Sequence, residues 1–456
     1  MNSLSFISLK QALLGFKFQI VRLAPAIYSS LKGNIPAAKN VQVEVDFDTN
    51  CSEFIDMLNY GRITTITFNH IFAGQVFNKV SKFQNVNKLQ FSGCSFGSYK
   101  ILCQVLVKYD IKELEIYKNL DYQCAVMQEI FSTIHMTKLE RATFKNCFIN
   151  DQCVIYFARN LPCSGVSYLD LSFNQISDIG ATALAGVLNS SQLKSLNLKG
   201  NQIGKLGLIN ISKALSCSKI QCVEIDTNRF DSDDWCILYN IIPKCKLKKL
   251  SARIYGEKSV LAFQQSLPQT DITELELDLY LEYLEAVLMA VSKSKVLKLS
   301  FLGYQPIHGK TLPLLLHSLP ANELILKNSN LGENISLLLS NIKNSQIKHL
   351  RIRDTTIKHQ DLSKVMLGGL DTLTFGLCEF QSSFLDKLAP IIIHSNIRKL
   401  IFEADLFSKE AILKFVGEIA LSMLRVLKIG LEGNEKTQLR KEIKSMLANS
   451  SINVII

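Results

Sequence analysis

One apolar pattern recurs along this 456-residue chain and limits what it can fold into. The stretch YLDLSFNQISDIGATAL at 168–184 returns 27 residues later as SLNLKGNQIGKLGLINI. Both copies have the frame L-x-x-L-x-L-x-x-N-x-I, in which strand-like alternation leads into apolar residues at helical spacing. A single strand–loop–helix repeat cannot bury its own apolar face, so this pattern predicts a stack of such repeats with one continuous core.

The frame covers nearly the whole chain at spacings of 23 to 28 residues. Its first positions are Ile63, Val86, Ile111, Leu139, Val166, Leu193, Ile220, Leu247, Ile272, Val296, Ala321, Ile347, Leu370, Ile397 and Leu424, with weaker frames at Asn40 and Ser451. We therefore predict an α/β solenoid of about 15–17 repeats over 40–456. Its parallel strands should form the concave sheet and its helices the convex side. Residues 1–39 are predicted to form an N-terminal helical cap.

The Asn of the frame should point inward, where the chain leaves the strand and backbone groups lose their ladder partners. A small Cys is the usual substitute at this place. The residues found there are Cys94, Asn119, Cys147, Asn174, Asn201 and Asn228. We predict structural roles for these cysteines and for Cys378, because buried thiols in apolar surroundings are unreactive.

This ladder of amides ends after Asn228. The next three repeats carry Tyr255, Tyr280 and Tyr304 at the same place, and a Tyr ring is too large for the inward site. Two interpretations remain open: a local irregularity of the solenoid or of the assumed register, or three neighbouring aromatic rings exposed at one rim as a binding edge.

The third, fifth and seventh residues of each frame should point outward from the strands. Acidic and basic residues occur there in equal number and alternate from strand to strand. Such alternation fits either lateral pairing within the sheet or recognition of a partner. The candidate partner-binding residues are Tyr168, Asp170, Glu224, Asp226, Lys249, Arg253, Glu274, Glu276, Asp278, His349, Arg351 and Arg353.

Several function classes are disfavoured by the sequence. The net charge of +11 would suit nucleic acid, but a surface of alternating charge does not suit a phosphate backbone. No run approaches the length of a membrane span. Nucleotide-binding, metalloprotease and esterase motifs are missing, and the seven His show no ligand spacing. We expect no catalytic residues, no metal and no cofactor. With no export signal, the twelve Cys are expected to be reduced in a cytoplasmic protein.

The segments LDLSFNQISDIGATALAGVL and LNLKGNQIG resemble the ribonuclease-inhibitor type of leucine-rich repeat. That resemblance implies a right-handed horseshoe and protein–protein recognition by a monomer through its concave face and loop rims. A regulator of a partner enzyme, such as a GTPase-activating repeat protein, is the alternative. The Lys-, Asn- and Ile-rich composition is also similar to repeat proteins that bacteria such as Legionella deliver into host cells. It implies an effector acting in the cytoplasm of a host cell.

Overall fold

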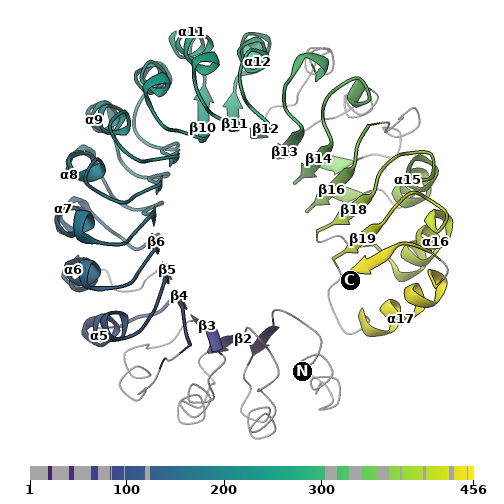
Figure 1. Cartoon of the computed structure of the whole chain (residues 1–456), viewed down its shortest axis with the longest axis horizontal. Coiled ribbons are helices and arrows are strands. Elements are labelled where there is room, and N and C mark those ends of the chain that lie inside the picture. Colours follow the sequence, from purple (N-terminus) through teal and green to yellow (C-terminus); the bar gives the residue numbers. More distant parts are fainter. Residues whose placement is uncertain are drawn as a thin grey trace, which may run out of the picture. The chain divides into compact units, whose positions relative to one another are not determined.

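The computed structural model describes residues 19–22, 41–45, 63–69, 83, 85–96, 98–118, 124–302, 316–327, 341–357, 369–380, 383–403, 407–430, 436–448 and 450–455. The chain divides into two compact units, Met1–Asp231 (unit 1) and Ser232–Ile456 (unit 2). Each unit has a layer of parallel strands on one side and a layer of helices on the other (Figure 1).

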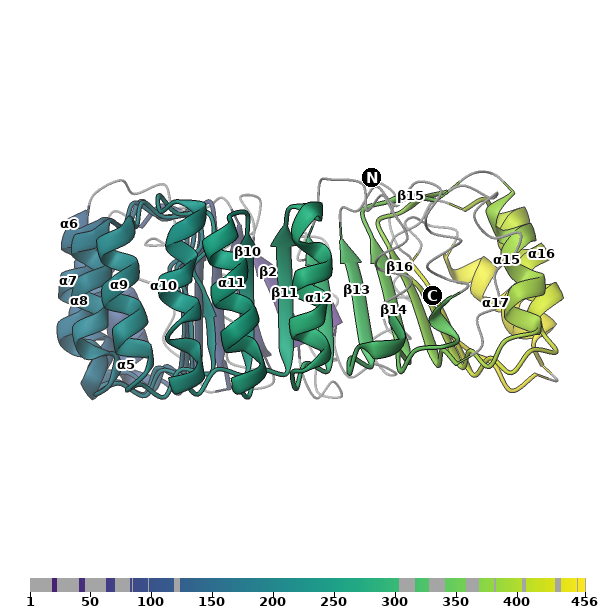
Figure 2. The same ribbon diagram turned by 90° about the horizontal axis from the view of Figure 1, so that it is seen from above.

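Unit 1 stacks its repeats in sequence order, each strand parallel to the next. Its strands are β1 Gln19–Arg22, β2 Val41–Val45, β3 Ile63–Asn69, β4 Lys88–Ser92, β5 Glu113–Tyr117, β6 Arg141–Lys145, β7 Tyr168–Asp170, β8 Ser195–Asn197 and β9 Cys222–Glu224. Its helices are α5 Lys100–Lys108, α6 Cys124–Thr133, α7 Asp151–Asn160, α8 Asp178–Leu188 and α9 Lys205–Leu215. Figure 2 shows α7, α8 and α9 standing side by side.

Unit 2 repeats this arrangement. Its main strands are β10 Lys249–Ile254, β11 Glu274–Leu279, β12 Lys298–Leu302, β13 Glu323–Lys327, β14 His349–Arg353, β16 Thr372–Gly376, β18 Lys399–Phe402, β19 Val426–Ile429 and β20 Asn453–Ile455. A second small sheet pairs β15 Thr356–Ile357 with β17 Glu379–Phe380. The helices are α10 Trp235–Tyr239, α11 Glu257–Ser266, α12 Leu284–Ser292, α15 Phe384–Ile393, α16 Lys409–Ile419 and α17 Lys436–Met446.

The core follows the repeat frame and confirms the predicted α/β solenoid class. Leu169 and Leu171 of the frame are fully buried, and so are Leu184 and Leu188 on α8. Strand β7 pairs with β8 so that Leu169 lies beside its counterpart Leu196 in the next repeat. Each such side chain contributes about 1.5–3 kcal/mol when it leaves water. The stack therefore supplies the apolar burial that no single repeat could provide.

The predicted inward amide is confirmed in detail at Asn174. Its Oδ1 accepts hydrogen bonds from the backbone N–H groups of Cys147 at 2.9 Å and Ile149 at 3.1 Å. Its Nδ2 donates to the carbonyl oxygens of Phe144 at 2.7 Å and Leu171 at 2.9 Å. One side chain thus satisfies buried backbone groups in two successive repeats, which is the role the sequence assigns to this position.

Asn201 and Asn228 bond in the same way, and Asn119 lies outside the described residues. At the cysteine positions the thiol donates to a backbone carbonyl of the preceding repeat at 3.3–3.4 Å, in Cys94, Cys147 and Cys378. These three cysteines are buried and form no disulfide, as expected. The expectation that all cysteines are reduced does not hold at Cys153 of α7, which is disulfide-bonded.

A second ladder joins the helices of unit 1. The carboxylate of Asp178, at the start of α8, accepts hydrogen bonds from the backbone N–H groups of Gly204 at 2.7 Å and Gly207 at 2.8 Å. These groups lie at the start of α9, where helical N–H groups have no partner within the helix. A Cβ on Gly207 would lie 2.6 Å from the Asp178 carboxylate, so this position requires glycine. Asp151 binds the start of α8 in the same manner.

The N-terminal segment differs from the prediction where it is described. Residues Gln19–Arg22 form strand β1, which pairs in parallel with β2, in place of the expected helix. The remainder of 1–39 lies outside the described residues. The sequence FQIVRL at 18–23 follows the frame, with Phe18, Val21 and Leu23 at its first, fourth and sixth positions. The repeat therefore begins one strand earlier than 40.

Candidate protein-binding surface

The strand face of unit 1 carries the predicted alternation of acidic and basic side chains. Lys88 on β4 forms ion pairs with Glu113 at 3.3 Å and Glu115 at 2.7 Å on the adjacent strand. The Arg141 guanidinium lies over the Tyr168 ring, 3.9 Å from its centroid. Burial, together with the nearby Asp170 charge, raises the pKa of Tyr168 to about 12. Tyr168 is half-buried. Part of the alternation of charge between strands is therefore lateral ion pairing within the sheet.

Two candidate residues of unit 1 are buried and do not belong to an accessible surface. Asp170 is 8% exposed, and its carboxylate accepts a hydrogen bond from the backbone N–H of Ser172 at 2.8 Å. Asp226 is 2% exposed and forms an ion pair with Lys199 at 2.8 Å. Strands β7 and β9 are only three residues long. The Asp170 carboxylate turns back onto the backbone where β7 ends, and that of Asp226, two residues beyond β9, turns toward Lys199. Glu224, by contrast, stays half-exposed on β9.

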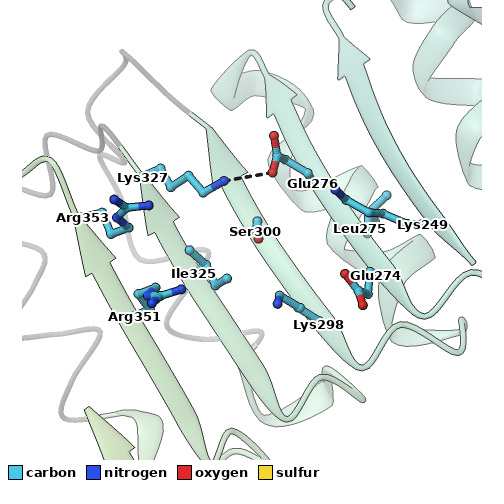
Figure 3. Close-up of a pocket in the computed structure, with 10 residues that line it drawn as sticks. All are labelled: Lys249, Glu274, Leu275, Glu276, Lys298, Ser300, Ile325, Lys327, Arg351 and Arg353. Carbon is cyan, nitrogen blue, oxygen red and sulfur yellow. Dashed lines mark hydrogen bonds and ion pairs between the residues drawn. The ribbon is translucent and has the colours of Figure 1, made fainter. Parts of the chain in front are cut away.

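Unit 2 gathers several candidate residues around one hollow of about 210 Å³ on its strand face (Figure 3). We call this hollow the basic depression. It is lined by Lys249, Glu274, Leu275, Glu276, Lys298, Ser300, Ile325, Lys327, Arg351 and Arg353. Five of these side chains are cationic and two are acidic. The lining comes from five consecutive strands, β10 to β14, because each strand presents every second residue on this face.

Short side chains create the floor of the basic depression. Ser300 on β12 and Ile325 on β13 lie side by side in the parallel register and are almost buried. Longer side chains stand on both sides of them (Figure 3). The Lys327 ammonium reaches across β12 and donates to Glu276 Oε2 at 3.0 Å. Because this pair joins strands that are not neighbours, it needs a small residue such as Ser300 on the strand between.

Glu403, directly after β18, makes a second bridge that skips a strand. One carboxylate oxygen accepts a hydrogen bond from Arg351, and the other lies 3.6 Å from Arg353 Nε. The bridge passes over β16 at Gly376, where a Cβ would lie 2.5 Å from Glu403 Oε2 and 3.0 Å from Arg353 Nε. Gly376 thus makes room for the carboxylate that holds both arginines in place.

The sequence pointed to only part of this site. Lys249, Glu274, Glu276, Arg351 and Arg353 were candidates and are brought together. The side chains not singled out are Lys298, which pairs with Glu323 at 3.4 Å, Lys327, Ser300 and Glu403. The sequence feature that could have indicated these side chains is the small residue on the intervening strand, Ser300 between Glu276 and Lys327 and Gly376 between Arg353 and Glu403. Three further candidates lie outside the depression: Arg253 and Asp278, which pair at 3.4 Å, and the exposed His349.

The two described tyrosines of the predicted rim follow β10 and β11 directly. Ile254 pairs with Leu279 without a shift, so Tyr255 and Tyr280 occupy equivalent places on neighbouring strands. Their ring centroids are 4.7 Å apart, and Tyr280 is 44% exposed. Burial and a hydrogen bond with Asp278 raise the pKa of Tyr255. Tyr304 lies outside the described residues.

In the described part of the chain, no three His, Cys, Asp or Glu side chains are placed to hold a metal ion. None of its helices is long and apolar enough to cross a membrane.

Repeats of parallel strands and helices with an inward Asn or Cys define a solenoid class, and part of the chain matches one particular kind of repeat. Residues 166–185 and 189–212 match the family described as Leucine Rich repeat. No curated protein sequence matches the chain.

Solved structures show only loose likeness. Rad7 in complex with Elc1 from yeast is 12% identical, with 90% of this chain and 89% of that chain covered and a TM-score of 0.36. The internalin inlF of Listeria monocytogenes is 11% identical, with 85% and 90% covered and a TM-score of 0.32. Actin-binding site 2 of leiomodin-1 is 18% identical, with 37% and 86% covered and a TM-score of 0.25. The fold assignment follows from the repeat geometry described above.

Replacing Glu276 by lysine should leave folding intact. Its carboxylate lies on the outward face, about one-fifth exposed, and an ion pair of this kind contributes only about 0.2–1 kcal/mol. We expect Glu276→Lys to unfold in urea with the same cooperativity as the natural protein. Loss of the cooperative transition would show that Glu276 points into the core, contrary to the register described here.

Proposed function

We propose that this protein is a non-enzymatic scaffold that binds a partner protein through its strand face and the adjoining strand ends. The observation that carries the proposal is the basic depression of unit 2. Five strands there present long charged side chains around a floor of short ones. Shape and charge of this kind set the register of a bound protein and disfavour wrong partners. The exposed Tyr280, beside Tyr255, extends this surface to the strand ends, and tyrosines are enriched at binding hot spots.

Site-specific photo-crosslinking tests this proposal. We would place p-benzoylphenylalanine on the strand face, at the exposed His349 or Lys428, and on the helix side at Leu261 of α11. In a nuclease-treated lysate, the two strand-face probes should capture the same protein and the helix probe should not. Capture only from Leu261, or capture of nucleic acid in untreated lysate, would contradict the proposal.

A second candidate function is regulation of a partner enzyme. The convergence of Arg351 and Arg353 on Glu403 in the basic depression favours it, because a positioned arginine can stabilise charge in a partner's transition state. Measurement of the captured partner's GTPase rate with and without this protein separates the two. Binding without a change in rate leaves the scaffold function.

The proposal extends to where the protein acts. We propose a monomer that works in the cytoplasm of a host cell as a delivered bacterial effector, of the ribonuclease-inhibitor type of repeat. Its supports are the DIGATALAGVL run after Asn174 and the Lys-, Asn- and Ile-rich composition. A translocation reporter fused to the chain tests delivery, and light scattering tests the monomer. Failure of the reporter to enter host cells would contradict the effector role and leave partner binding untouched.

A further inference from the structure

The basic depression has a chemistry that specifies its occupant. We propose that it binds an acidic segment of the partner protein, with carboxylates seated over Ser300 and Ile325 among Lys298, Lys327, Arg351 and Arg353. This inference rests on the proposed scaffold function and names the kind of surface that the partner must present.

The size of the basic depression suits a side chain of a bound polypeptide better than an enclosed small molecule. The hollow of about 210 Å³ is smaller than the roughly 300–1,000 Å³ typical of pockets that enclose a small ligand. Glu276, Ser300, Ile325 and Arg351 occupy one row across strands β11 to β14. With strands about 4.8 Å apart, that row is about 14 Å long. An extended peptide can lie along such a row and lower one or two side chains onto the floor.

The cations of this site are held in place yet still reachable. Lys327 is fixed by Glu276, Lys298 by Glu323, and the two arginines by Glu403. The side chains of Lys298, Lys327, Arg351 and Arg353 remain 28–38% exposed. Binding therefore loses little side-chain entropy, since these groups are already ordered.

Arg353 is held by an ion pair and not by a hydrogen bond at Nε. This Nε is buried and lies 3.6 Å from Glu403 Oε2, while the side chain as a whole stays 33% exposed. A guanidinium carries five N–H donors in a fixed planar fork that matches a carboxylate. A carboxylate arriving over Ile325 can be met by this fork and by Arg351 two residues earlier on β14.

The carboxylates around the site favour a polypeptide over nucleic acid. Glu274 and Glu276 line the depression, and Glu323 and Glu403 lie among its cations. A backbone of evenly spaced phosphates would meet these negative charges along its path. A peptide can place acidic residues over the cations and a basic or neutral residue beside Glu274.

Fluorescence anisotropy with fluorescein-labelled hexaglutamate, using the full chain at about 150 mM salt, tests the inference. The double variant Lys298→Gln/Arg353→Gln should bind this probe about tenfold more weakly or worse, because two charge-assisted contacts are lost. Glu276→Gln should bind it about two- to fivefold more tightly, because one negative charge is removed from the lining of the depression. The matched control Lys428→Gln, on the same face of β19, should stay within about twofold.

The tighter hexaglutamate binding expected for Glu276→Gln distinguishes a specific effect from misfolding, because a badly folded variant would not bind more tightly. Urea unfolding of every variant should remain cooperative. The inference is overturned if hexaglutamate does not bind the natural protein, if Lys428→Gln weakens binding as much as the double variant, or if hexalysine binds equally well. Tighter binding of labelled oligothymidine, lost in the same double variant, would assign the site to nucleic acid instead.

Competition with inorganic phosphate adds a further arm. Inorganic phosphate would be added at an ionic strength about equal to that of the assay buffer. If it displaced hexaglutamate from the protein completely, the site would recognise any anion and the inference would fail. Photo-crosslinking of the double variant distinguishes failure of the acidic-segment inference from failure of the proposed scaffold function. If the His349 and Lys428 probes still capture the partner from the double variant as well as from the natural protein, only the acidic-segment inference is wrong.

Discussion

Replacing Asn174 by alanine is expected to destabilise unit 1 by about 3 kcal/mol or more. The change removes five hydrogen bonds, to Cys147 N, Ile149 N, Phe144 O, Leu171 O and Ser172 O. Asn174 is almost fully buried, so water cannot replace the lost partner without opening the stack. Each buried donor or acceptor left unsatisfied costs about 1–3 kcal/mol. The repeats on both sides of Asn174 should therefore open more readily.

Hydrogen exchange read by mass spectrometry, over peptides spanning 139–203, measures this loss locally. Asn210→Ala is the control, because Asn210 is half-exposed on α9 and its side-chain amide donates a hydrogen bond to Thr182 Oγ1 at 2.9 Å. It should change stability by less than about 0.5 kcal/mol. Asn174→Cys should fall between the two, since Cys147 fills the same place with one thiol donor to a neighbouring carbonyl. Equal effects of the two alanine variants would contradict the role of the amide.

The frame predicted the core because its period alone decides which side chains point inward. Leu169, Leu171 and Asn174 could be placed from their spacing, and so could Cys378, although its neighbours in sequence look different. The first strand was missed because Phe18, Val21 and Leu23 of that frame lie in a segment interpreted as helical. Spacing is therefore a stronger guide to the fold than the local composition of one segment.

The candidate site was harder to predict, since it depends on contacts between strands that do not adjoin. The frame places Lys327 and Glu276 on the same face but gives no reason to pair them across β12. That pairing follows from the short side chain of Ser300, as the pairing of Arg353 with Glu403 follows from Gly376. Small residues at outward positions thus indicate where charged side chains can pair across an intervening strand.

Conversely, the outward position of the frame did not guarantee exposure. Asp170 and Asp226 stand at outward positions but turn onto Ser172 N and Lys199. A short acidic side chain at the end of a short strand finds backbone N–H groups within reach, and this competes with exposure to solvent. Longer side chains at the same positions, such as those of Lys298 and Arg351, cannot fold back in this way and remain accessible.

Replacing Phe375 by alanine should cost unit 2 about 3–5 kcal/mol, the range for removal of a buried aromatic ring. Phe375 on β16 is 1% exposed. Its ring stacks on Phe402 at a centroid distance of 5.6 Å and meets the edge of Phe384 at 5.5 Å. The cavity left behind lies beneath Gly376, the residue over which Glu403 reaches the arginines. The same change should therefore also weaken hexaglutamate binding.

Urea unfolding followed by circular dichroism measures the stability, and anisotropy measures the binding. The control is Leu377→Ala, two residues along the same chain segment, whose side chain is 54% exposed and should matter little. If Phe375→Ala lowered stability but left hexaglutamate affinity at the natural value, the arginines would be held by Glu403 alone, whatever lies below. If both fell together, the aromatic core of β16 and β18 would be what keeps Arg351 and Arg353 in position, because Glu403 follows β18 directly and can bridge only while these two strands keep their register.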